Sequence, residues 1–261
     1  MKRVYLLFTI IFISTTVFSQ EENTQVDMVT DRPDATESSS VVPLHKLQIE
    51  TGAFYESFEE NNFKTEVLGY NTTLVRFGLL ENLELRLGWN FEEHQKSFLG
   101  QKDPNVLSGL SPLLFGVKVS ISEEKGLLPE IGLLVHAYLP LTSSTDFNAE
   151  NTGVDFRFSL AHTLNEKSSI GYNLGAAWAN DSSEASFIYT LAYGYSLTEK
   201  LGAYAEIYGD LPENNSANHY WDMGVTYLIY YNLQLDATVG TSFTEGQDLL
   251  VSTGVSYRFP N

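Results

Sequence analysis

The sequence predicts an all-β fold: a transmembrane, up-and-down antiparallel β-barrel of about twelve strands with both termini on the periplasmic side. Three observations support this prediction. From residue 46 onward, large apolar residues alternate with small or polar ones, which is the period of a β-strand. The alternating stretches run for about 10 to 14 residues, long enough to cross a bilayer on a tilt. Short and longer connections alternate along the chain, as expected for the two rims of a barrel.

The start of the chain has the features of a secretory signal peptide. A basic pair, Lys2 and Arg3, precedes an almost wholly apolar stretch at 4–13, and small or branched residues lead to an expected cleavage after Ser19. The alternative is a membrane anchor, but polar residues interrupt the apolar run before it reaches the about 20 residues that a spanning helix needs. We therefore expect residues 1–19 to be a signal peptide and the mature chain to lie in the outer membrane of a Gram-negative bacterium.

Residues 20–45 are predicted to be an irregular periplasmic segment. They are polar, rich in Thr, Ser and Asp, and show neither the strand nor the helix period. One hypothesis is that this segment plugs the mouth of the barrel, with Arg32 paired to an inward carboxylate such as Glu50 or Glu84. The alternative is a rigid turn outside the barrel.

Residues 46–261 are predicted to form the barrel. The clearest strand lies at 185–197, where large residues such as Leu191 alternate with small ones such as Ala192. The same pattern predicts strands near 46–57, 65–79, 83–93, 109–122, 128–140, 153–163, 168–180, 185–197, 200–210, 218–230, 232–241 and 248–259.

The connections predict the arrangement of these strands. A propeller has a similar repeat length, but each of its blades needs four strands, whereas each period here holds two. Tight turns are expected at 81–82, 123–126, 165–167, 198–200 and 231–232, and longer loops at 58–64, 94–108, 141–152, 181–184, 211–217 and 242–247.

Alternation alone does not say which face meets lipid. The predicted strands are longer than those of typical soluble proteins, and aromatic residues such as Trp89, Trp178 and Trp221 fall near strand ends, as interfacial girdles require. Both features favour an apolar face turned toward lipid. A soluble, secreted, lipocalin-like binding barrel would instead turn the same face inward, and it remains an alternative.

The predicted strand number implies a narrow lumen. Small residues on the inward face favour a lumen that is open: Gly88, Gly116, Gly132, Gly171, Gly175, Ala177, Gly194, Gly224, Gly240 and Gly254. Inward charges are candidates for a ladder that sets solute selectivity, with mutual pairing that stiffens the wall as the alternative. These candidates are Glu50, Arg76, Glu84, Arg86, Asp155, Arg157, Asp222, Asp236 and Arg258.

Composition and motifs argue against other classes of function. The chain has no cysteine, and its net charge of -18 does not suit nucleic acid. Five scattered histidines lack a metal-ligand spacing, and no nucleophile elbow, P-loop or dinucleotide fingerprint occurs. We therefore expect no catalytic residues, metal or cofactor, and no enzyme activity. The expected partners are outer-membrane lipid, the barrel assembly machinery and a small-molecule solute.

Two stretches carry a resemblance to a known family. The segment TDRPDATES at 30–38, which contains Asp31, Arg32, Pro33 and Asp34, and the hairpin TLVRFGLLENLELRLG at 73–88 resemble bacterial outer-membrane barrels named for the MetA pathway of phenol degradation. The resemblance implies a channel for passive or facilitated diffusion of small, aromatic or apolar compounds. A closed structural or adhesive barrel is the competing class. One departure is that Phe259 is followed by two further residues, whereas such barrels commonly end on an aromatic.

Overall fold

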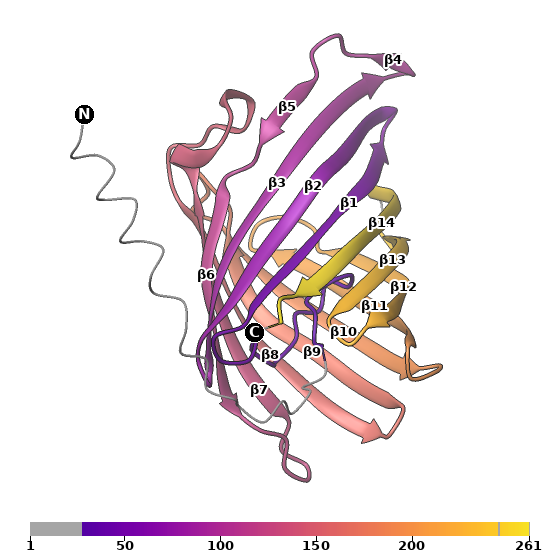
Figure 1. Cartoon of the computed structure of the whole chain (residues 1–261). Helices are drawn as coiled ribbons and strands as arrows, with labels where there is room; N and C mark the ends of the chain where they lie inside the picture. The colour runs from indigo at the N-terminus through magenta and orange to yellow at the C-terminus, as the bar shows by residue number, and fades with distance from the viewer. Residues whose placement is uncertain (1–27, 245, 261) are drawn as a thin grey trace, which may run out of the picture.

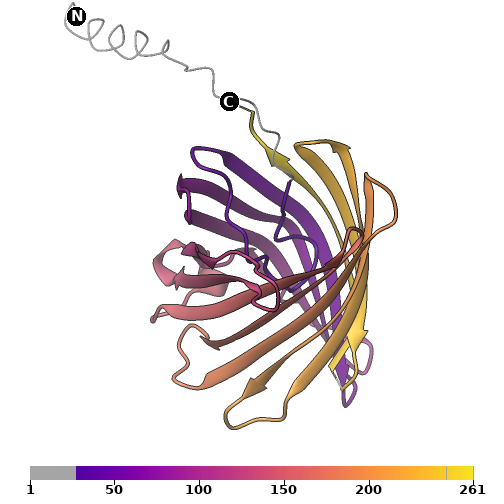
Figure 2. The same cartoon turned by 90° about the horizontal axis from the view of Figure 1, so that it is seen from below.

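The computed structural model of the chain describes residues 28–244 and 246–260, which form a closed antiparallel β-barrel (Figures 1 and 2). One sheet contains 14 strands; β4 and β5 are short pieces beside the end of β3, so 12 long strands form the wall. Consecutive long strands are paired, and pairing of β1 with β14 closes the ring. The predicted all-β class and twelve-stranded barrel are confirmed. The predicted signal peptide lies outside the described residues.

The strand bounds agree with the predicted positions within a few residues for most of the wall. The strands are β1 (Leu47–Glu60), β2 (Phe63–Leu80), β3 (Leu83–Phe98), β4 (Gln101–Lys102), β5 (Leu107–Leu110), β6 (Leu113–Ser122), β7 (Glu130–Leu139), β8 (Gly153–Asn165), β9 (Ser168–Trp178), β10 (Ala185–Ser196), β11 (Leu201–Pro212), β12 (Asn218–Tyr230), β13 (Leu233–Ser242) and β14 (Gly246–Arg258). Two 3-10 turns, η1 (Pro140–Thr142) and η2 (Thr145–Phe147), lie between β7 and β8.

The prediction of a longer loop at 58–64, between the first two strands, is wrong. Strand β1 runs through Glu60 and β2 starts at Phe63, so only Asn61 and Asn62 turn the chain, with φ values of 50° and 67°. Asparagine tolerates the positive φ that a two-residue hairpin turn needs, which is why the strands continue to the tip. Phe63 packs on Phe98 of β3 with ring centroids 4.4 Å apart. Strands β1 to β3 therefore extend past their neighbours at the top of Figure 1.

The ends of the barrel wall lie together at the rim that carries the tight turns. The backbone N–H of Phe259 donates to the carbonyl of Leu47, and that of Arg258 donates to Asn232 in the turn between β12 and β13, each at 2.9 Å. An even number of long strands requires this arrangement, because the last strand then returns to the rim where the first began. The connections at 99–112 and 140–152, which are the longest, lie at the opposite rim, where Asn61 and Asn62 also form a two-residue turn.

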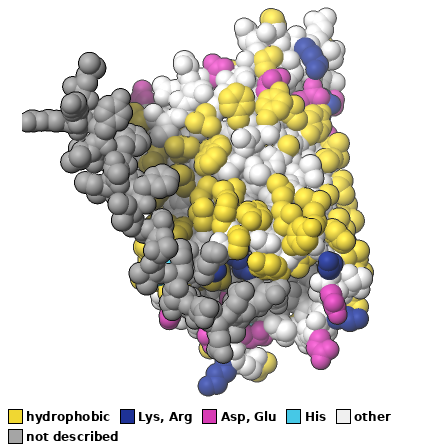
Figure 3. Space-filling view, in the orientation of Figure 1, with side chains coloured by type: hydrophobic (Ala, Val, Ile, Leu, Met, Phe, Trp, Pro, Cys, Tyr) yellow, Lys and Arg dark blue, Asp and Glu magenta, His cyan; other side chains and the backbone are white. Residues whose placement is uncertain are grey.

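The barrel wall is apolar outside and polar inside. Large apolar side chains are exposed on the outer face, for example Leu174 (56% exposed) and Phe158 (42%). On the side of the barrel seen in Figure 3, hydrophobic side chains form a yellow band with charged residues above and below it. Charged side chains such as Arg76 and Glu84 are fully buried inside. A lipocalin-like barrel in water requires the opposite distribution, whereas a barrel in lipid requires this one.

An N-terminal segment, residues 28–46, runs inside the barrel and contains no strand (Figure 2, indigo trace). It passes directly over inward glycines: a Cβ added at Gly254 would collide with the Arg32 side chain, and one added at Gly132 would collide with the carbonyl of Ser39. The small inward residues were expected to leave the lumen open. At these positions they instead make room for the chain's own backbone and side chains.

Candidate functional site in the lumen

The centre of the lumen is a buried ionic cluster built around Asp31 of the N-terminal segment. Both oxygens of its carboxylate accept hydrogen bonds from Lys118 Nζ at 2.8 Å, and Oδ2 also accepts from Arg86 Nη1 at 2.5 Å. Arg76 Nη1 lies 3.2 Å from Oδ2. The three cations come from β6, β3 and β2. Burying a charge without partners costs free energy. The three wall cations therefore stabilise the buried Asp31, and Asp31 in turn stabilises them.

Arg76 joins this cluster to two carboxylates of neighbouring strands. Its guanidinium donates to Glu50 of β1 at 2.8 Å and to both oxygens of Glu84 of β3 at 2.8 and 2.9 Å. Period-two alternation turns all three side chains inward, and strand pairing places Glu50 and Glu84 each two residues from the position directly opposite Arg76, within reach of its long side chain. Glu50 and Glu84 also accept backbone N–H groups of the segment, at 2.9 Å from Asp31 and 2.8 Å from Val42.

Arg32 pairs with a different carboxylate from those expected. Its side chain donates to Asp236 of β13 at 3.0 and 3.3 Å and to Thr72 at 3.3 Å. Glu50 binds only the backbone N–H of Arg32, at 3.0 Å, and among the described residues no hydrogen bond joins Arg32 to Glu84. The reason is geometric, because the Arg32 side chain extends over Gly254, whose neighbour across the sheet is Asp236.

The segment is held on the far wall by Glu206 of β11. This carboxylate accepts the backbone N–H groups of Ala35 and Thr36 at 2.5 and 3.1 Å and the hydroxyl of Thr36 at 2.8 Å. Asp34 and Asp222 lie near Glu206, and one oxygen of Asp222 is buried with no hydrogen-bond partner among the described residues. Three carboxyl groups therefore gather on this side of the lumen.

The remaining predicted residues lie at different heights in the barrel. Asp155 of β8 accepts from Tyr138 Oη at 2.9 Å and lies 3.0 Å from His136 Nδ1. Arg157 lies two residues on, facing the lumen, and Pro33 lines the cavity at the tight-turn mouth. Arg258 is buried at the end of β14, and its backbone carbonyl accepts from Asn232 at 3.0 Å. The predicted charges are thus all in the wall, but they form several groups rather than one ladder.

Sequence reasoning missed the residues that hold the segment most directly. Lys118 lies between Val117 and Val119, and Glu206 between Ala205 and Ile207, so alternation alone would have assigned both to the inward face. Glu37, whose carboxylate accepts Arg86 Nη2 at 2.8 Å, had no such signal because its segment has no period.

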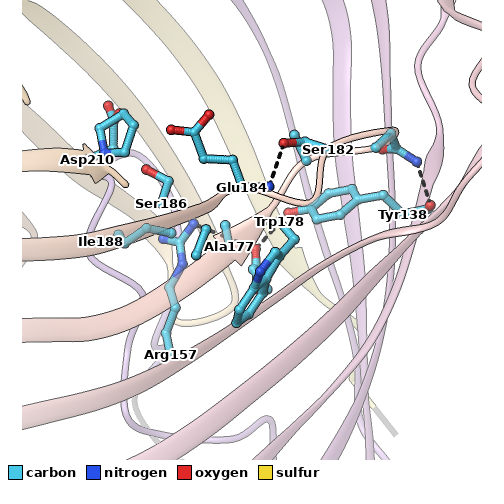
Figure 4. A pocket seen from close by; sticks show the side chains of 14 residues that line it. Tyr138, Arg157, Ala177, Trp178, Ser182, Glu184, Ser186, Ile188 and Asp210 are labelled. Atoms are coloured by element: carbon cyan, nitrogen blue, oxygen red, sulfur yellow. Dashed lines mark hydrogen bonds and ion pairs between the residues drawn. The ribbon is translucent and has the colours of Figure 1, made fainter. Parts of the chain in front are cut away.

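Three cavities lie in the lumen around the segment. One of about 440 Å³ opens at the tight-turn rim, and two, of about 400 and 510 Å³, lie toward the long-loop rim and share Tyr138. Arg32 lines both the first and the second of these, so its side chain separates the two mouths. The third cavity is shown in Figure 4, with Arg157 and Tyr138 among its lining residues.

Metal-binding geometry is not found in the described residues: none of the groups of three or more His, Asp or Glu among 28–244 and 246–260 could hold an ion. No helix in the same part of the chain is long and apolar enough to span a membrane.

A closed barrel with an apolar outer belt and a polar, partly filled lumen defines the class of outer-membrane β-barrels of Gram-negative bacteria. Solved structures with this fold include an outer membrane channel from Pseudomonas putida F1, with a TM-score of 0.62 and 13% identity over 85% of this chain and 98% of that one. The KdgM porin in complex with disordered oligogalacturonate follows at 0.53 and 11%, over 82% and 99%. The translocator domain of autotransporter NalP from Neisseria meningitidis has a TM-score of 0.52 and 14% identity, over 82% and 88%.

Within this class, the chain belongs to one family. The family model described as "Putative MetA-pathway of phenol degradation" matches residues 30–259, which cover the N-terminal segment and almost the whole barrel. This confirms the resemblance based on the two motifs at 30–38 and 73–88. No curated protein matches the chain in sequence.

Proposed function

We propose that this protein is a passive diffusion channel for small molecules across the outer membrane. The observation that carries the proposal is the set of cavities on both sides of the N-terminal segment, inside a wall that is closed on every side. A purely structural barrel has no need for water-sized space at both mouths. Channel and porin are also the words used for two of the solved structures with this fold.

The solute class proposed from the family is small, aromatic or apolar compounds. Family membership supports this class through the description of the family, which refers to phenol degradation. The lumen offers apolar wall next to charge, for example Leu74 and Leu114 in the cavity that Arg86 also lines. Such a mixed surface suits a solute with an apolar body and one polar group.

The orientation follows the general rule for these barrels, in which short turns face the periplasm and longer loops face outward. On this basis residues 1–19 are the cleaved signal peptide, residues 20–45 are the N-terminal periplasmic segment, whose described part at 28–45 enters the lumen from the periplasmic mouth, and residues 46–261 are the membrane domain. The lipid bilayer and the barrel assembly machinery are then the partners during insertion.

Within the channel, we assign the Asp31, Arg32, Pro33 and Asp34 motif to the constriction. Arg32 separates the two mouths, and Asp31 anchors the segment to three cations of the wall. The inward charges then serve two purposes: those bound to the segment hold it in place, and those left facing a cavity contact the solute.

Planar-bilayer recording of the purified mature chain tests the channel function. Discrete conductance steps are expected, together with liposome swelling in a panel of sugars, amino acids and aromatic acids. Membranes that stay sealed at all voltages and vesicles that do not swell would contradict the proposal and favour the closed structural or adhesive barrel.

A further inference from the structure

The cavity of Figure 4 contains Arg157, whose guanidinium makes longer contacts than those of Arg32, Arg76 and Arg86. Arg157 Nη1 lies 3.5 Å from the carbonyl of Ala35, Nη2 lies 3.9 Å from Asp155, and Nε has no hydrogen-bond partner within the described part of the chain. By contrast, Arg76 and Arg86 each contact carboxylates at 2.8 Å or less. The Arg157 side chain is 20% exposed, and it lines a cavity of about 510 Å³. A guanidinium in this state has donors available for a bound anion.

Strand pairing builds the rest of this cavity around Arg157. Ala177 on β9 lies opposite both Asp155 of β8 and Ser186 of β10, so a small residue forms the floor between these two strands. Ile188, on β10, pairs with Gly175 and supplies an aliphatic wall (Figure 4). Two neighbouring strand spacings correspond to about 10 Å, the width of a benzene ring with one substituent lying between the walls.

A second polar atom without a partner among the described residues lies across the cavity from Arg157. The hydroxyl of Ser186 is buried and makes no hydrogen bond to the described residues, although Ser186 lines the cavity. Buried polar atoms are nearly always hydrogen-bonded in folded proteins. Arg157 and Ser186 therefore carry two donors, on either side of Ala177, that a bound solute can satisfy together.

The carboxylates of the cavity already have partners on at least one oxygen. Asp155 binds Tyr138 and His136, Glu184 accepts the N–H of Asn214 at 2.6 Å, and Asp210 accepts from Asn218 at 3.0 Å. Glu184 and Asp210 lie on the side of the long-loop rim. Their negative charges repel a solute that carries two carboxylates. They also weaken the binding of a solute with one carboxylate, which suits a channel site that must release its ligand.

We propose that this cavity is a binding site for small monocarboxylates with an apolar or aromatic body. The carboxylate binds Arg157 and Ser186, and the apolar body lies over Ala177 against Ile188. This assignment rests on the proposed channel function and specifies its solute class. Neutral analogues lack the charge that Arg157 recognises, and dicarboxylates meet Glu184 and Asp210.

Binding of benzoate, benzyl alcohol and phthalate to the mature chain in detergent, measured by calorimetry or ligand-observed NMR, tests the site. Benzoate is expected to bind about tenfold more tightly than either of the others, the scale of one charge-assisted hydrogen-bond pair. Equal affinity for benzoate and benzyl alcohol would overturn the proposal. Because the assay needs no open lumen, benzoate binding with sealed bilayers would reject the channel while retaining the site.

Variants locate the binding. Arg157→Gln is expected to weaken both benzoate and acetate about tenfold, and Ala177→Leu, which fills the floor, is expected to weaken benzoate while sparing acetate. Lys102→Gln removes a positive charge from the same rim outside the cavity and is expected to change neither. Retained heat-modifiable migration on gels reports folding of each variant. If Arg157→Gln does not fold, Ala177→Leu and the comparison of benzoate with benzyl alcohol still decide; unchanged benzoate affinity in Ala177→Leu would contradict the site.

Discussion

Arg32 and Asp236, 204 positions apart in the chain, meet inside the barrel with Nη2 and Oδ1 3.0 Å apart. This ion pair connects the irregular N-terminal segment to β13, the strand that is paired with β14 in the barrel wall. Through this contact the Arg32 side chain is held between the cavities of the two mouths of the barrel.

Arg32→Ala is expected to raise single-channel conductance, because the Arg32 side chain is shared by the cavities of the two mouths. Loss of the pair leaves Asp236 buried without its cation, which destabilises the barrel by about 3 kcal/mol. Bilayer recording and urea unfolding in detergent measure the two effects, with Lys64→Ala at the exposed tip of β2 as a control. Unchanged conductance together with unchanged melting would reject the role of the segment as a constriction.

Asp31→Asn is expected to destabilise the barrel by about 3 to 5 kcal/mol, because it removes the carboxylate that accepts hydrogen bonds from the buried Lys118 ammonium. Replacing both partners removes the stranded charge, so Asp31→Asn with Lys118→Met is expected to cost less than Asp31→Asn alone. Equilibrium unfolding of the wild type, both single variants and the double variant measures the coupling. Additive costs would show that the two residues act independently.

Gly254→Ala is expected to displace the Arg32 guanidinium from Asp236, because the added Cβ would collide with this side chain rather than with the wall backbone. Increased conductance is the expected result. Gly88→Ala is the matched control, since its Cβ meets its nearest atoms at 3.4 Å, an ordinary contact. In an Arg32→Ala background the Gly254 substitution should have little further effect; an undiminished effect there would mean that the clash lies elsewhere.

The loop carboxylate of Asp181 makes one contact pH-dependent. Backbone N–H groups of Glu150 and Asn151 donate to it at 2.6 to 3.1 Å and lower the pKa of this carboxyl below its usual range. A lowered folded-state pKa means that the stabilisation is present above the ordinary pKa near 3.8 and is lost as pH falls through the folded value. Hydrogen exchange of the two amides should therefore lose protection under strong acid. Asp181→Ala should remove that protection at neutral pH as well, and intact protection in this variant would contradict the assignment.

The sequence by itself determined the barrel. A period of two, sustained over long stretches and broken by turn residues, permits only strands with one apolar and one polar face, and residues such as Arg76 and Glu84 were assigned correctly to the inner face from that period. Alternation is a local property, so it can be found in a single chain. The length of the first hairpin could not be found this way, because Asn61 and Asn62 allow the strands to continue through a stretch that resembles a polar loop.

Only the tertiary structure decided what fills the lumen. Residues 28–46 have no period, and their hydrogen bonds go to side chains far away in sequence, such as Glu206 and Asp236. Inward glycines predict that the lumen has space. The local sequence pattern is the same whether water or a folded segment of the chain occupies that space. The choice depends on the order of residues around the closed ring, which places β1 beside β14 and brings Asp236 within reach of Arg32.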